Sequence, residues 1–260
     1  MKNLHFYFVI TLICVLFASL SYAESIKGNL SSYSLKNSRS FKVPLKEISG
    51  LAIDYRNNFL YAHNDSGNQS IVYVIDPKNG NVIKEILIKG CRNYDWEDIT
   101  TDRKGTFWII DSRYEIIEFK TDENATLIDK SVKKYGLPKE LQGKNVEALD
   151  YLEDEHKMVA ILKDDAQEIF KFSLKDKNAE YLGSLHSLKL KPSGLTRHPE
   201  TGNYFIVAFE GHKIIEMTPD FKNYLAKLHI PFMFQFQPEA IDFDKDLNLY
   251  FGAEKSWYRA

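Results

Sequence analysis

The sequence predicts an all-β protein that folds as a five-bladed β-propeller, with six blades as the alternative. Two observations carry this prediction. A short motif returns five times at a nearly constant spacing, and each copy is followed by apolar strands that turn residues separate. A fixed period in the forties is typical of propellers when each unit reads as strands, and no long helical pattern competes with it.

Each copy of the motif has Ser or Glu, then a small residue or Asp, then Leu or Ile. Successive copies begin 48, 50, 46 and 46 residues apart. We therefore treat five residues as equivalent, and each should lie where the chain enters the first strand of a blade. They are Ser49, Glu97, Glu147, Ser193 and Glu239.

A second strand follows each motif and ends in a polar residue, at offsets of 15, 14, 16, 17 and 15 residues from the motif. The five polar residues are Asn64, Asp111, Lys163, Glu210 and Glu254. Four units continue into an alternating third strand, as in 71–76, and turn sequences such as Asp76-Pro77-Lys78-Asn79-Gly80 separate the strands. With a weaker fourth strand, each unit reads as one four-stranded blade.

The repeat boundaries predict how the ring closes. Four complete units span 49–96, 97–146, 147–192 and 193–238. The last unit, 239–260, is about half a period long, and residues 24–48 supply the other half. We expect the N-terminal strands, including one at 41–45, to complete the C-terminal blade, so that 24–260 forms a single closed domain without exposed sheet edges.

Residues 1–23 read as a secretory signal peptide. Lys2 precedes an almost wholly apolar run from Phe6 to Leu20, and Ser21-Tyr22-Ala23 suits signal peptidase, so cleavage is expected after Ala23. The alternative is a membrane anchor, but the run is shorter than the ~20 residues that span a bilayer. The sequence thus predicts an exported protein, periplasmic or extracellular, with no stable membrane insertion after cleavage.

Composition narrows the possible partners. The formal net charge is −2, which gives no electrostatic reason to expect nucleic-acid binding. Cys91 would be the only cysteine after cleavage, so no internal disulfide can form and packing must hold the fold. We expect a monomer whose ligand or protein partner lies outside the cytoplasm.

The two sets of polar residues should meet at one mouth of the central channel, because the loop entering the first strand and the loop leaving the second lie at the same end of a blade. Clustered carboxylates repel one another unless they bind a cation, hold protons or pair with basic groups. Oxygen ligands without Cys favour calcium before magnesium. Alternatively, each residue only caps backbone amides of its own loop. The candidate metal ligands are Asp65, Glu97, Asp111, Glu147, Glu210, Glu239 and Glu254.

These motifs resemble the SdiA-regulated family of exported bacterial proteins, distant relatives of NHL-repeat propellers. The resemblance lies in Glu47–Leu51, Asn64-Asp65, Asp95–Glu97 and Pro238–Ile241, and it extends from about 41 to 254. It implies a five-bladed propeller with a calcium site and assigns no reaction. His63–Gly67 and Asp95–Asp98 look more distantly similar to phytase-like and esterase-like propellers.

Two functions remain open on the sequence. The first is a calcium-binding module that recognises a ligand or partner, for which no catalytic residue is needed. The second is a calcium-dependent hydrolase of the lactonase or phosphoesterase kind, in which His63 or a carboxylate acts as base. A glycosidase that uses two carboxylates of the mouth is a third, argued from fold alone. The sequence has no Gly-x-Ser-x-Gly and no His-x-x-x-His motif, which favours the binding module.

Overall fold

The computed structural model of the chain describes residues 30–35, 38–112, 114–231 and 236–255. These residues form four four-stranded antiparallel sheets, one two-stranded sheet and two short 3-10 helices. The strands are rich in Ile, Val, Phe and Tyr, which suit the half-buried surfaces of a sheet. The predicted signal peptide, residues 1–23, lies outside the described residues. Within the described residues, no helix has the length and apolar character needed to cross a membrane.

Each of the four complete blades follows the chain from its inner to its outer strand. Blade 1 contains β1 (Ile48–Asp54), β2 (Phe59–Asn64), β3 (Ile71–Ile75) and β4 (Val82–Leu87). Blade 2 contains β5 (Trp96–Thr101), β6 (Thr106–Asp111), β7 (Glu115–Lys120) and β8 (Lys133–Gly136). Blade 3 contains β9 (Val146–Leu152), β10 (Lys157–Leu162), β11 (Glu168–Phe172) and β12 (Glu180–Ser184). Blade 4 contains β13 (Pro192–Arg197), β14 (Tyr204–Ala208), β15 (Lys213–Met217) and β16 (Tyr224–His229).

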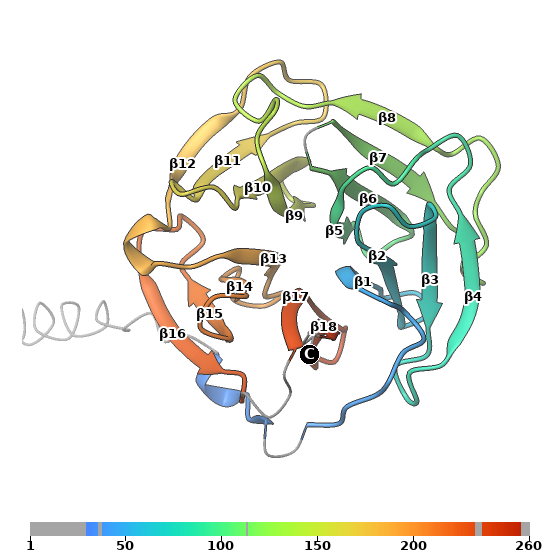
Figure 1. Cartoon of the computed structure of the whole chain (residues 1–260), viewed down its shortest axis with the longest axis horizontal. Coiled ribbons are helices and arrows are strands. Elements are labelled where there is room, and N and C mark those ends of the chain that lie inside the picture. Colours follow the sequence, from blue (N-terminus) through green and yellow to red (C-terminus); the bar gives the residue numbers. More distant parts are fainter. Residues whose placement is uncertain (1–29, 36–37, 113, 232–235, 256–260) are drawn as a thin grey trace, which may run out of the picture.

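The inner strands surround a common axis, and the outer strands form the rim (Figure 1). β1, β5, β9, β13 and β17 (Phe236–Phe243) lie innermost, and each contacts its two neighbours in cyclic order. Burial decreases from the inner to the outer strand of a blade. Nearly every residue of β1 is buried, whereas β4 has largely exposed and half-buried residues. The apolar core lies between neighbouring sheets, as is expected when sheets pack face to face around an axis.

The predicted blade count is corrected by the structure. Four blades are complete, and the fifth position holds only the pair β17 and β18 (Leu249–Lys255), so the described residues form neither five nor six full blades. The strand expected at 41–45 does not form, because these residues make no backbone ladder with β18. Residues 24–29 and 256–260, which the predicted closure also involves, lie outside the described residues, so closure by strand pairing stays a prediction.

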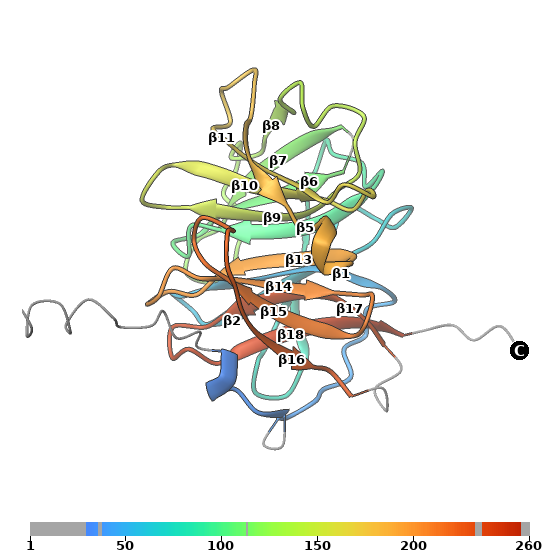
Figure 2. The same cartoon turned by 90° about the vertical axis from the view of Figure 1, so that its left-hand side faces the viewer.

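The N-terminal segment nevertheless covers the outside of the two-stranded sheet. The 3-10 helix η1 (Leu30–Ser32) lies beside β16, and the chain then passes outside β17 and β18 towards β1 (Figures 1 and 2). Leu30 and Tyr33 pack against Phe205 and Phe243 of the blade 4 core. Further along, Val43 and Leu45 join the apolar cluster between blade 1 and β17. The described part of the N-terminal segment is therefore attached to the neighbouring sheets by side-chain packing.

Each inner strand contains a β-bulge at the repeated Ser or Glu. In β1, Ile48 pairs with Asn64 and Gly50 with His63, so Ser49 has no partner across the ladder. The same skip occurs in the other four inner strands. The skipped residues are Ser49, Glu97, Glu147, Ser193 and Glu239. A bulge redirects a side chain and ends regular pairing, which is why this position tolerates a polar residue in a buried strand.

In four of the five inner strands the residue after the bulge is Gly or Ala, and the narrow axis requires a small residue there. In β5 this residue is Asp98. A Cβ atom at Gly50 would lie 2.8 Å from the backbone nitrogen of Ile99 in β5, and one at Gly194 would lie 2.6 Å from the carbonyl oxygen of Glu239 in β17. Inner strands approach this closely because five of them surround one axis. The next residue of each motif, such as Leu51 or Leu195, is buried in the apolar core.

Buried carboxylates link neighbouring inner strands. Asp98 accepts hydrogen bonds from the backbone N–H groups of Ile99 (2.8 Å) and of Leu149 in β9 (2.9 Å), and burial raises its pKa well above the ordinary value. Asp242 of β17 accepts the backbone N–H of Ile53 in β1 at 2.8 Å. These bonds satisfy donors that face the axis and tie β5 to β9 and β17 to β1.

Arg103 crosses the opposite end of the channel. Its guanidinium donates to the Tyr55 hydroxyl and to the Arg197 carbonyl oxygen (3.2 Å), and it lies 3.7 Å from Asp242. These partners belong to blades 1 and 4 and to β17, so one side chain of blade 2 spans the axis. Asp150, beside this group, is almost fully buried, and its Oδ2 atom accepts no hydrogen bond among the described residues.

We predict that Leu30→Ala lowers the free energy of unfolding by about 2–5 kcal/mol, because it opens a cavity among aromatic side chains. Leu30 is 1% exposed, although it lies outside every blade. Leu87→Ala is the control, since Leu87 is 50% exposed and should cost less than about 1 kcal/mol. Urea unfolding measures both. Equal effects would mean that the N-terminal segment contributes nothing to stability.

A second prediction concerns Asp150, whose pKa is raised to about 7 by burial, against the attraction of Arg103. Asp242 also raises this pKa, while Thr100 and Arg197 lower it. Between about pH 4 and pH 7 the folded chain holds a proton that the unfolded chain has released, so stability falls as pH rises through that window.

Compared with Asp150→Asn, the wild-type chain should therefore lose up to about 1.4 kcal/mol of unfolding free energy per pH unit in this window and level off above it. Urea unfolding of both proteins across the pH range gives the difference directly. A difference that stays flat or rises with pH would contradict the assignment.

Candidate functional site

The mouth is the end of the channel at which the chain enters each inner strand and leaves each second strand. The structure corrects the predicted equivalence of the second set of polar residues. In every complete blade, the residue directly after the second strand donates its backbone N–H to the loop before the inner strand. This shared hydrogen bond defines which residues are equivalent between blades. These residues are Asp65, Ser112, Lys163 and Phe209, and Glu254 follows from the register of β17 and β18. Asn64 and Asp111 come one residue too early in the predicted set, and Glu210 one too late.

This one-residue difference matters because successive strand residues face opposite sides. Asn64 and Asp111 are consequently buried, with Asp111 fully inaccessible. Asn64 Oδ1 accepts the backbone N–H groups of Lys46 and Glu47 at 3.0 and 3.1 Å, so it fixes the approach to β1. Glu210 is exposed in the turn after β14. The side chain of Glu254 lies outside the described part of the chain.

Three carboxylates converge at the mouth. Asp65 follows β2, while Asp95 and Glu97 flank the first residue of β5, and oxygen atoms of the three lie within 4.8 Å of one another. All three side chains are partly accessible. At this distance and an effective dielectric constant of ~20, each ionised pair would repel by roughly 3.5 kcal/mol. A bound cation or a retained proton would remove this repulsion.

The pKa of Glu97 reflects the repulsion between these carboxylates. Burial, followed by the nearby Glu147 and Asp65 carboxylates, raises the pKa of Glu97 to about 10. Asp95 adds to the same effect, and Lys163 opposes it. In the absence of a cation, Glu97 therefore holds its proton at neutral pH. A divalent ion among these oxygens would replace that proton and remove the repulsion.

The loops that carry the three carboxylates are held together. The Asn93 side-chain amide donates to the carbonyl oxygens of Asn64 and Asp65 at 3.0 and 2.9 Å, and its own oxygen accepts the Trp96 N–H at 3.1 Å. One buried asparagine thus fixes the loop before β5 against the loop after β2. The geometry of the site is set before any ligand arrives.

Asp111 holds the same loop from below. Its Oδ2 atom accepts the Tyr94 backbone N–H at 3.3 Å, while its buried Oδ1 accepts no hydrogen bond among the described residues. Burial raises the pKa of Asp111 to about 6, and the charges of Asp95 and Glu115 contribute. Asp111 is a support of the site rather than part of the three-carboxylate cluster.

The other side of the mouth is neutralised by a lysine. Lys163 Nζ lies 2.8 Å from Glu147 Oε2, and Asn145 donates to Glu147 Oε1 at 2.8 Å. Glu147 is almost fully buried. Glu239 is also buried, accepts a hydrogen bond from the Gln237 amide at 3.3 Å and lies close enough to influence Lys163. The predicted ligands Glu147 and Glu239 thus lie around an ammonium group, and Glu147 is also connected to the carboxylate cluster by a side-chain hydrogen bond with Glu97.

His63, the predicted base of a hydrolase, is fully buried. Its Nδ1 atom lies 3.1 Å from the carbonyl oxygen of Asn64, and its ring contacts Trp96 edge to face. A Cβ atom at Gly50 would lie 2.5 Å from its Nε2. Burial lowers the pKa of His63 to about 4. A neutral imidazole enclosed by inner strands is a packing residue and cannot reach a substrate at the mouth.

Sequence reasoning missed two features of the mouth. Asp95 joins the cluster from the loop directly before β5, outside the repeated Ser or Glu position on which the prediction of ligands rested. Tyr94 and Tyr114 form an exposed aromatic pair beside the cluster, with ring centroids 5.1 Å apart. The sequence offered little indication of this pair, because both tyrosines lie in loops and only the fold determines how these loops are placed relative to each other.

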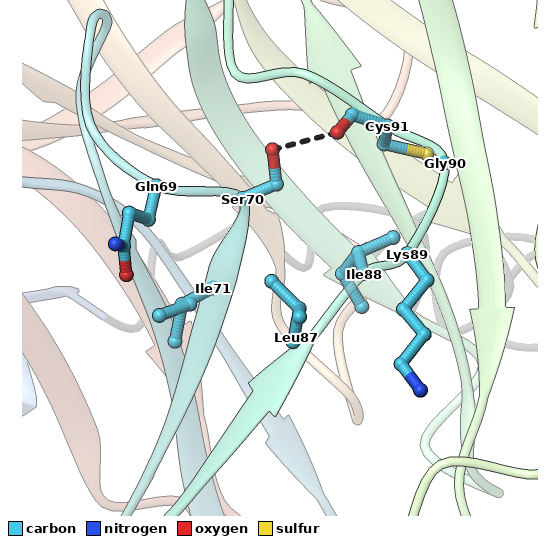
Figure 3. Close-up of a pocket in the computed structure, with 8 residues that line it drawn as sticks. All are labelled: Gln69, Ser70, Ile71, Leu87, Ile88, Lys89, Gly90 and Cys91. Carbon is cyan, nitrogen blue, oxygen red and sulfur yellow. Dashed lines mark hydrogen bonds between the residues drawn. The ribbon is translucent and has the colours of Figure 1, made fainter.

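One surface hollow is separate from these carboxylates. It has a volume of about 480 Å³ and lies at the rim of blade 1, between the start of β3 and the segment after β4 (Figure 3). Its lining is largely apolar, and the Ser70 hydroxyl donates to the Cys91 carbonyl oxygen there at 3.0 Å. Burial raises the pKa of the half-buried Cys91 thiol, which makes it a poor nucleophile.

Comparison with known structures places this fold among propellers. The chain is similar to one in the nidogen–laminin complex, with TM-score 0.55 and 19% identity over 81% of this chain and 73% of that one. It is similar to luciferin-regenerating enzyme, with TM-score 0.55 and 16% identity over 83% and 86% of the two chains. It is also similar to the glutaminyl cyclase of Myxococcus xanthus, with TM-score 0.57 and 8% identity over 84% and 90%. At such identities the likeness shows the fold alone.

Sequence comparison gives the family. A search of curated protein sequences finds no match. The family model described as SdiA-regulated matches residues 29–258, which is nearly the whole chain and includes every motif copy. The chain belongs to the SdiA-regulated family.

Proposed function

We propose that this protein is an exported calcium-binding propeller that recognises a ligand or partner at the mouth of its channel. The observation that carries the proposal is the convergence of Asp65, Asp95 and Glu97, whose oxygens lie within 4.8 Å of one another on loops already fixed by Asn93. The ion would hold these loops and present open coordination positions to a ligand.

The donor set fits calcium. All three groups are carboxylates, and calcium accepts irregular coordination by carboxylate, carbonyl and water oxygens. Magnesium requires near-ideal octahedral geometry, which loops from two different blades are less suited to provide. The raised pKa of Glu97 supports the same conclusion, since burial and neighbouring negative charge make the site deficient in positive charge.

Binding is preferred to catalysis because the mouth offers no activated nucleophile among the described residues. His63 is buried, Cys91 lies at the rim with a raised pKa, and Ser193 Oγ donates to the Pro238 carbonyl oxygen at 2.7 Å. Export rests on the N-terminal sequence, and it agrees with a calcium site, because calcium is abundant outside cells and scarce in the cytosol.

Calcium should stabilise the protein against unfolding. Binding to the native state alone adds about 2.7 kcal/mol when free calcium exceeds its dissociation constant a hundredfold. Calorimetry of chelator-treated protein, titrated with calcium and separately with magnesium, measures this increase. An unchanged melting temperature in millimolar calcium would refute the proposal.

Glu97→Gln locates the site. The amide keeps the shape of the side chain but removes the charge, so the calcium-induced increase should shrink, while the metal-free variant should be at least as stable as the metal-free wild type at neutral pH. Glu210→Gln is the matched control, because Glu210 is exposed in the turn after β14 of blade 4, whereas the cluster lies on blades 1 and 2. If both variants respond to calcium as the wild type does, the ion binds elsewhere.

The hydrolase alternative predicts turnover. We expect no calcium-dependent hydrolysis across a panel of chromogenic esters, lactones, phosphate esters and glycosides, assayed with calcium and with chelator. A calcium-dependent rate near the ~10 s⁻¹ typical of enzymes that Glu97→Gln abolishes would replace the binding function with catalysis.

A further inference from the structure

An exposed aromatic stack stands beside the proposed ion. Tyr94 is 50% and Tyr114 56% exposed, and their ring centroids are 5.1 Å apart with the rings inclined by 39°. The Arg92 guanidinium lies over Tyr94, 4.8 Å from its centroid. Arg92 and Tyr114 both contact the ring of Tyr94. The ring that remains accessible to a ligand is therefore that of Tyr114. Large exposed aromatic groups that contact each other are commonly binding surfaces.

The stack is fixed to the three-carboxylate cluster. Tyr94 directly precedes Asp95, and its backbone N–H donates to Asp111 Oδ2 at 3.3 Å. The Tyr114 N–H donates to the Asp111 carbonyl oxygen at 2.8 Å. One buried aspartate therefore anchors both tyrosine backbones, and Asn93 anchors the same loop to Asp65. A preorganised aromatic surface loses little entropy when a ligand binds.

The charges at the mouth limit the chemical class of ligand that can bind there. Five carboxylates surround it, against which stand one calcium ion, the Lys163 ammonium and the Arg92 guanidinium, so a net charge of about −1 remains. This charge disfavours phosphate esters and carboxylates. A cation that sought the aromatic rings would meet the Arg92 guanidinium already over Tyr94. A neutral, hydroxyl-rich ligand with one flat apolar face suits both the ion and the stack.

We propose that the mouth binds a neutral carbohydrate, with sugar hydroxyls on the calcium ion and the C–H face of the sugar ring on Tyr114. Hydroxyl oxygens can replace water as calcium ligands because calcium accepts six to eight oxygens, and three carboxylates leave positions open. The inference rests on the proposed calcium site. It adds the chemical class of ligand and assigns a role to Tyr94 and Tyr114.

The test uses the biotinylated protein, assembled on fluorescent streptavidin so that several copies bind at once and weak contacts become detectable. This complex is applied to a printed array of neutral glycans, sialylated glycans and phosphocholine, with calcium or with chelator. Tyr114→Ala is compared with Tyr181→Ala, because Tyr181 is also 56% exposed but lies on the outer strand of blade 3. Calorimetry measures the calcium response of each variant separately.

We expect binding to neutral glycans that chelator abolishes. Tyr114→Ala should weaken this binding about tenfold, the size of one aromatic contact, and keep the calcium-induced rise in melting temperature. Tyr181→Ala should match the wild type in both measurements.

Failure of the carbohydrate proposal is distinguishable from failure of the calcium site. A normal calcium response without neutral-glycan binding overturns the carbohydrate proposal alone, as does a preference for sialylated or phosphocholine spots. Glycan binding that survives chelator, or that Tyr114→Ala leaves unchanged, also overturns it. Loss of the calcium response in the wild type overturns the calcium site on which it rests.

Discussion

The bulge in each inner strand is the constraint on which the rest of this molecule depends. A regular ladder would pair every residue of β1 or β5 and bury the repeated Ser or Glu between sheets. Skipping one residue removes that side chain from the ladder and directs it towards the channel mouth. The same skip places Gly or Ala, or Asp98 in β5, against the neighbouring inner strand and a Leu or Ile in the core. Of three consecutive residues in the motif, the first therefore supplies the polar side chain of the mouth, and the next two pack against the neighbouring strand and in the core.

The carboxylates of the mouth differ in their partners. Asp65, Asp95 and Glu97 stand together without a basic partner at hydrogen-bonding distance among the described residues. Next to them in blade 3, the Lys163 ammonium pairs with the buried Glu147, which shares a side-chain hydrogen bond with Glu97. A carboxylate paired with an ammonium gains less from a further cation, so the proposed metal ion would be favoured more by Asp65 and Asp95 than by Glu147.

The buried residues around the mouth hold the loops of the site in place. Asn93 and Asp111 are buried, and both bind backbone atoms of the loop that carries Asp95. His63 fills the space behind this loop against Trp96. From the sequence, Asp111 and His63 are candidate functional residues because they are polar and lie beside the motif. Their buried hydrogen bonds instead make them positioning groups, and they explain why the accessible groups at the mouth are few.

The sequence by itself determined the propeller class, the repeat units and the gathering of carboxylates at one end, because an amphipathic period and a recurring motif report local structure directly. It located Asp65 and Glu97 in the cluster for the same reason. Tertiary structure decided the rest. Strand register, which depends on long-range pairing, moved the equivalent residue from Asp111 to Ser112. Among the described residues the fifth sheet has two strands, and the N-terminal segment meets its neighbourhood through apolar side chains, since apolar contacts need no fixed register whereas strand pairing does.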